Sequence, residues 1–97
     1  MDRVTLQQKG HSAYVRKDDL IIEWYDFGDD APYESANLIV FDAPGRAALA
    51  RSLGLAEDAD DAALLTRIAR SFPSWFEAKS FAQREGVPFR SEVDFMP

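Results

Sequence analysis

Cysteine is absent from this 97-residue chain, which has one histidine and only five prolines and five glycines. Without cysteine there can be no disulfide, no thiolate nucleophile and no cysteine-ligated zinc or iron–sulfur site. This composition fits a reducing compartment, so we expect a cytoplasmic protein. At this length we expect a single domain, residues 1–97, stabilised by the packing of one modest core.

Long apolar runs are missing too. The N-terminal residues contain no apolar segment of the kind found in signal peptides, and the longest apolar runs are only as long as strands. We therefore expect a soluble protein without a membrane span. Gly28, Gly45 and Gly54 do not have the spacing of a nucleotide-binding loop, so an ATPase or a dinucleotide enzyme is disfavoured and no cofactor is expected.

The charge of the chain is unevenly distributed. The formal net charge is -6, and residues 18–61 carry twelve Asp and Glu against Arg46 and Arg51, a net -10. Nucleic acids and anionic membranes are bound chiefly through Lys and Arg, so this field disfavours both as partners. It favours a protein partner with a basic surface.

The stretch 19–42 organises the rest of the chain. Two runs rich in β-branched and aromatic residues, 20–25 and 38–41, predict strands separated by an acidic loop with glycine and proline. In the first strand, alternation places Leu20, Ile22 and Trp24 on the better core face. The other face carries a charge in its middle and is still partly apolar: Ile21, Glu23 and Tyr25.

Further elements are expected on both sides of this stretch. Alternation from Val4 onward predicts a first hairpin, so residues 1–42 form a β-meander. Residues 43–86 predict three helices, with Asp42 capping the first and a capping box formed by Ser74 and Glu77 at the third. Residues 87–97 alternate like a half-buried strand, placed on a sheet edge because Pro88 cannot donate to a ladder.

These elements predict an α+β fold. We expect an antiparallel sheet of four to five strands, made of the N-terminal meander plus a C-terminal edge strand, packed against three short helices. The chain shows no internal repeat and no second domain.

The acidic loop and the aromatic residues around it form the candidate binding surface. Tyrosines partly exposed and rimmed by charge are typical of protein interfaces. The predicted binding residues are Tyr25, Asp26, Asp29, Asp30, Tyr33 and Glu34. The order of the acids does not match a calcium-binding loop, so no metal site is predicted.

Catalytic residues are not predicted. His11, the only histidine, is expected in an exposed turn without a function, because no orienting acid accompanies it and Ser12. Adjacent carboxylates such as Asp60 and Asp61 are expected at turns and helix N-termini rather than across a substrate cleft.

We therefore expect a small acidic, non-enzymatic protein-interaction module that binds a basic partner, such as an inhibitor or an immunity-type protein. One alternative is a homodimeric structural or regulatory domain joined by a sheet face or edge. Another is a small-molecule-binding domain or enzyme with a pocket between the sheet and the helices.

Overall fold

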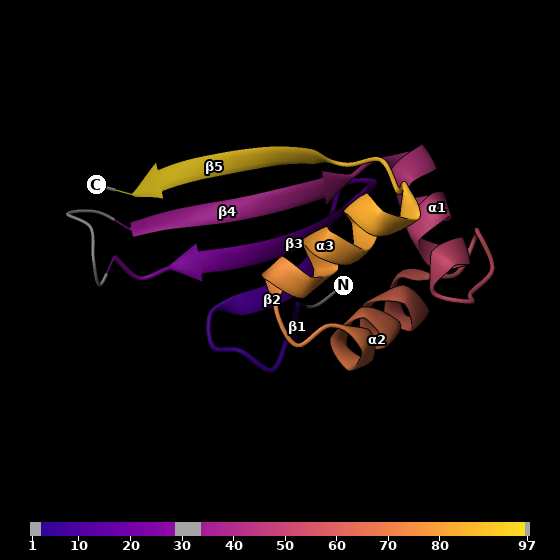
Figure 1. Ribbon diagram of the computed structural model, residues 1–97, viewed down its shortest axis with the longest axis horizontal. Helices are drawn as coiled ribbons and strands as arrows, with labels where there is room; N and C mark the ends of the chain where they lie inside the picture. The colour runs from indigo at the N-terminus through magenta and orange to yellow at the C-terminus, as the bar shows by residue number, and fades with distance from the viewer. Residues whose placement is uncertain (1–2, 29–33, 97) are drawn as a thin grey trace.

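The computed structural model describes residues 3–28 and 34–96 of the chain. In these residues a four-stranded meander is followed by three helices and a last strand (Figure 1). The bounds are β1 Val4–Thr5, β2 His11–Arg16, β3 Asp19–Asp26, β4 Glu34–Phe41, α1 Ala43–Ser52, α2 Asp61–Ser71, α3 Trp75–Glu85 and β5 Arg90–Met96. The expected order of elements is confirmed.

The five strands form one antiparallel sheet in the order β1-β2-β3-β4-β5. After the helices the chain returns and β5 pairs with β4, from Arg90 opposite Val40 to Met96 opposite Glu34. The fold is therefore α+β, and β5 is an edge strand, as the sequence predicts. The strand begins later than the alternation suggests, because Val87 is buried among the helices rather than in the sheet.

The three helices have the start signals that the sequence predicts. Asp42, Asp60 and Ser74 each accept a hydrogen bond from a backbone N–H in the first turn of α1, α2 and α3. Helix α3 ends at Gly86, whose φ of 68° is left-handed, and the N–H of Val87 returns to a carbonyl in its last turn at 2.9 Å. Within residues 3–28 and 34–96, no helix is long and apolar enough to cross a membrane.

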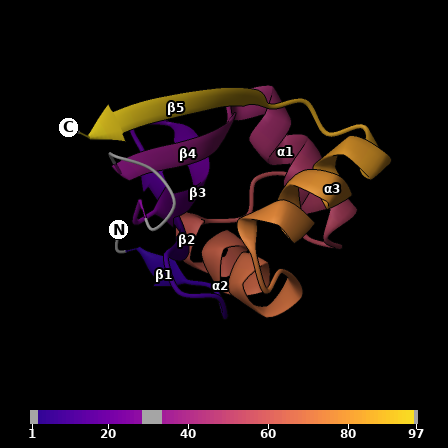
Figure 2. The ribbon, with the colours of Figure 1, turned by 60° about the vertical axis from the view of Figure 1, so that its left-hand side comes forward.

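The main core lies between one face of the sheet and the helical layer. Figure 2 shows all three helices on the same side of the sheet. Leu20 and Ile22 of β3 point to this side and are fully buried. They share the core with residues from each helix: Leu49 and Ala50 of α1, Leu64, Leu65 and Ile68 of α2, and Ala78 and Ala82 of α3. Each large apolar side chain buried here contributes about 1.5–3 kcal/mol to stability.

The opposite face of the sheet has none of these helices over it, and we call it the helix-free face. Its central side chains Ile21, Leu38 and Val40 are nevertheless at most 2% exposed. Tyr14 and Tyr25 pack against this small apolar cluster. Ion pairs cross the same face, joining Arg16 to Glu92 and Arg90 to Asp19. Long side chains of the sheet itself thus cover the face that the sequence leaves partly apolar.

His11 is not the exposed turn residue that the sequence predicts. It is the first residue of β2, is only 4% exposed, and its Nδ1 accepts a 2.8 Å hydrogen bond from the backbone N–H of Trp75. Trp75 is the first residue of α3, where backbone N–H groups lack partners within the helix. Just before His11, Gln8 donates its N–H to the carbonyl of Pro73 at 3.0 Å. The prediction was wrong because the local sequence around His11 gives no sign that its ring nitrogen accepts a hydrogen bond from a helix that begins 64 residues later.

Aromatic rings enclose His11 at this junction. Its ring stacks on Trp24 with centroids 6.2 Å apart, and Phe76 lies 5.9 Å away. Trp75 in turn packs on Trp24 at 5.8 Å. Burial among these rings lowers the pKa of His11 below its ordinary value, since desolvation penalises the charged imidazolium. The neutral form is the one whose Nδ1 can accept the helix N–H.

Replacing His11 with Ala is expected to destabilise the fold by about 1–3 kcal/mol, because the Trp75 N–H would remain buried without an acceptor. His11→Asn is the matched control, since its side-chain oxygen can accept the same hydrogen bond and does not titrate. Chemical denaturation of the two variants and the wild type measures the difference.

The same histidine predicts a pH dependence. Because the folded pKa of His11 is lowered, the unfolded state binds more protons as the pH falls below about 6.5, and the free energy of unfolding decreases there. Between about pH 8 and about pH 5.5, the wild type is expected to lose more stability than His11→Asn. Equal losses in the two proteins would contradict this account.

Candidate functional site

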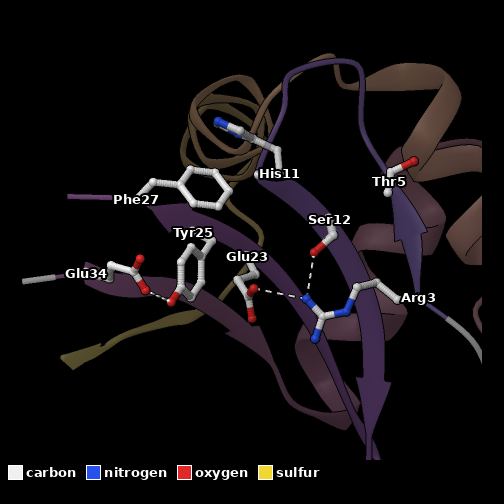
Figure 3. A pocket seen from close by; sticks show the side chains of 9 residues that line it. Arg3, Thr5, His11, Ser12, Glu23, Tyr25, Phe27 and Glu34 are labelled. Carbon is white, nitrogen blue, oxygen red and sulfur yellow. Dashed lines mark hydrogen bonds and ion pairs between the residues drawn. The ribbon is translucent and has the colours of Figure 1, made fainter. Parts of the chain in front are cut away.

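A groove of about 530 Å³ lies on the helix-free face, where the β1–β2 turn meets the residues that follow β3. It is open to solvent on one side, and Figure 3 shows its side chains from nearby. The lining residues are Arg3, Thr5, Gly10, His11, Ser12, Glu23, Tyr25, Phe27 and Glu34. The ring of His11 points away from the other side chains, toward the helical layer (Figure 3). The groove and the contact between His11 and the start of α3 therefore lie on opposite faces of β2.

The floor of the groove is a polar network around Glu23. This carboxylate belongs to a residue only 9% exposed, and it accepts hydrogen bonds of 3.0 Å from Arg3 and of 3.0 Å from the Tyr14 hydroxyl. Arg3 also donates to Ser12 at 2.9 Å, and its guanidinium lies 4.1 Å from the Tyr14 ring centroid. Burial, together with the adjacent Glu23 carboxylate, raises the pKa of Tyr14. A buried carboxylate needs such partners, and here Arg3 neutralises it.

One end of the groove combines aromatic rings with a carboxylate. The Tyr25 hydroxyl donates a hydrogen bond to Glu34, and this bond is the main cause of a raised pKa of Tyr25. The rings of Tyr25 and Phe27 pack with centroids 5.1 Å apart, and Phe27 is 47% exposed. Among the residues that the structure describes, Glu34 has no cationic partner. The ammonium group of Lys9 lies 5.4 Å from the Phe27 ring centroid, so a cation of the chain itself already contacts this end of the groove.

Gly10 allows the β1–β2 turn to approach this aromatic end closely. Its φ is +86°, and a Cβ on it would lie 2.9 Å from the Tyr25 carbonyl oxygen and 3.0 Å from a ring carbon of Phe27. The Gly10 carbonyl also accepts the Tyr25 N–H at 2.7 Å. A side chain here would be strained and would push into the groove.

Only part of the predicted binding set lies together. Tyr25 and Glu34 line the groove, whereas alternation along β3 places Asp26 on the face that carries Trp24. The Asp26 carboxylate accepts the Gly28 N–H at 3.0 Å, so it holds the turn. The remaining predicted residues lie outside the described residues: Asp29, Asp30 and Tyr33.

Several lining residues were not predicted. Glu23 and Phe27 flank Tyr25 in sequence, and the alternation that put Glu23 on the non-core face was a usable signal. Arg3 gave no such signal, because its partner Glu23 is 20 residues away. In the described part of the chain, no three His, Asp or Glu side chains lie close enough together to hold a metal ion.

Comparisons of the chain with protein-family models, with curated proteins and with solved structures found no match. Two aromatic rings beside a carboxylate form an environment that attracts a cation, because the ring faces and the carboxylate are both negative.

Replacing Glu34 with Ala is expected to lower the pKa of Tyr25 toward its ordinary value of about 10, because this change removes the hydrogen bond that is the main cause of the raised pKa and also removes the negative charge. Tyr14, whose partner is Glu23, serves as an internal control and should keep its raised pKa. An NMR titration of the tyrosine ring carbons measures both. An unchanged Tyr25 pKa in Glu34→Ala would refute the role given to this carboxylate.

Proposed function

We propose that this protein is a small acidic protein-interaction module whose groove receives an Arg or Lys side chain from a basic partner. The observation that carries the proposal is the groove end at which Tyr25 and Phe27 lie beside Glu34. The aliphatic part of an Arg or Lys can lie on the rings while its charged head reaches the carboxylate. The formal net charge of -6 adds a long-range attraction for a basic surface.

The polar floor of the groove supports a recognition role. The Glu23 carboxylate is already held by Arg3 and Tyr14, so the floor is a fixed surface rather than a free reactive group. A rigid floor reduces the loss of side-chain freedom on binding, which leaves more of the interaction energy as affinity. We therefore propose a binding module rather than an enzyme, of the kind that an inhibitor or immunity-type protein represents.

The remaining features of the proposal rest on composition. The absence of cysteine supports a reducing, cytoplasmic environment. The acidic charge supports a protein partner over a nucleic acid or a membrane surface, because phosphate groups are bound by basic residues. The buried apolar cluster between the sheet and the helices supports an interaction module over the alternative of a ligand pocket in that place.

The proposal predicts a salt-sensitive partner whose binding depends on Glu34. Reversing this charge with Glu34→Lys is expected to weaken binding about tenfold, because the partner's cation would then face a lysine. Asp58→Lys is the matched control: it makes the same charge change at an exposed position in the connector between α1 and α2, away from the groove (Figure 1). Affinity capture at low salt followed by titration of the recovered partner measures the effect.

The wild type and Asp58→Lys are expected to retain the same partner at low salt and to release it at high salt. Phe27→Ala should weaken binding without changing the net charge, which separates the aromatic contribution from the electrostatic one. Equal binding by Glu34→Lys and Asp58→Lys would show that only the overall charge matters and would refute the groove as the binding site.

A further inference from the structure

Strand β5 presents an open edge on the side of the sheet away from the groove. Among the residues that the structure describes, β5 pairs only with β4, and Figure 1 shows no other strand or helix beyond its outer edge along residues 90–94. Two of its apolar side chains are largely exposed, Val93 at 48% and Phe95 at 63%. An edge strand of this length with exposed apolar side chains is a template for pairing with another strand.

The ladder shows which backbone groups of β5 point outward. The bond from the Tyr25 N–H to Gly10 means that odd-numbered residues of β3 direct their backbone groups toward β2. The even-numbered residues of β3 therefore direct their backbone groups toward the odd-numbered residues of β4. The even-numbered residues of β4 face the other way and bond to the even-numbered residues of β5. Ser91 and Val93 consequently point their N–H and C=O groups away from the sheet.

We infer that β5 pairs antiparallel with β5 of a second copy of this chain, around a two-fold axis at Glu92. In this register Ser91 of one copy lies opposite Val93 of the other. Their outward groups exchange backbone hydrogen bonds on both sides of the axis, and the two sheets become one continuous sheet. Symmetric pairing of one edge with itself gives a closed dimer.

Charge along β5 supports a second copy in this register. On the helix-free face the strand carries Arg90, Glu92 and Asp94, and the proposed register puts Arg90 opposite Asp94 of the second copy, twice. Glu92 meets its own copy at the axis, but its carboxylate is already paired with Arg90 at 2.9 Å and Arg16 at 3.6 Å. A register centred on Val93 would instead put Glu92 opposite Asp94 twice, which is repulsive.

The dimer goes beyond the proposed function and does not depend on it. The groove is lined from β1, β2, β3 and the start of β4, so the outer edge of β5 can be occupied while both grooves remain open. A dimer would present two grooves to a partner with repeated basic side chains, which increases the overall binding strength.

Sedimentation equilibrium of the full chain tests the inference. The wild type is expected to show a reversible dimer. Val93→Pro removes an outward N–H that β4 does not use, and by symmetry two interface hydrogen bonds are lost, so the dissociation constant should rise about thirtyfold. Val93→Thr keeps the N–H and should stay within about threefold of the wild type. A wild type that stays monomeric at high concentration, or a Val93→Pro dimer as strong as the wild type, would overturn the proposal.

A second pair of variants tests the register and decides the matter if Val93→Pro fails to fold. Asp94→Arg places an arginine opposite Arg90 of the second copy and should weaken the dimer about tenfold. Asp58→Arg makes the same charge change away from the edge and is expected to leave the dimer unchanged. Equal dimerisation of these two variants would refute the proposed register.

Discussion

The alternation of side chains along β3 is the constraint on which the rest of the structure depends. Leu20 and Ile22 point to the helical layer and are fully buried, while Glu23 and Tyr25 point to the opposite face. The strand lies in the middle of the sheet, so both of its faces are in use. A shift of one residue in its pairing would move the charge of Glu23 into the helical core and is therefore strongly disfavoured. The same register creates the core and the floor of the groove.

The fold could be predicted largely from local sequence because its elements have clear local signals. The apolar runs of β3 and β4, the caps at Asp42 and Ser74 and the left-handed Gly86 each act within a few residues. The end of the chain was harder: Val87 fits a strand pattern, but it is buried against the helices after the α3 stop. Local alternation cannot separate a strand residue from an apolar residue that closes a helix end.

The groove could be predicted only in part, because its residues come together through tertiary contacts. Tyr25 and Glu34 belong to the binding surface that the sequence predicts around the acidic loop, whereas Arg3 reaches Glu23 from the start of the chain. His11 shows the same difficulty, since its partner is the first amide of a helix distant in sequence. The resulting back-to-back arrangement joins the helical layer and the groove through β2. The β1–β2 turn and the first residue of β2 contact the start of α3 and also border the groove. A change that loosens the contact with α3 is therefore expected to alter the groove as well.

The most direct test of cation recognition is an NMR titration of the nitrogen-15-labelled protein with a short arginine peptide and its citrulline analogue, which has nearly the same shape without the charge. The arginine peptide is expected to shift the backbone amide signals of Gly10, Tyr25 and Phe27, and high salt should suppress these shifts. The citrulline peptide should have little effect. Equal shifts with both peptides would contradict the account. So would an arginine peptide that shifts only the signals of residues outside the groove.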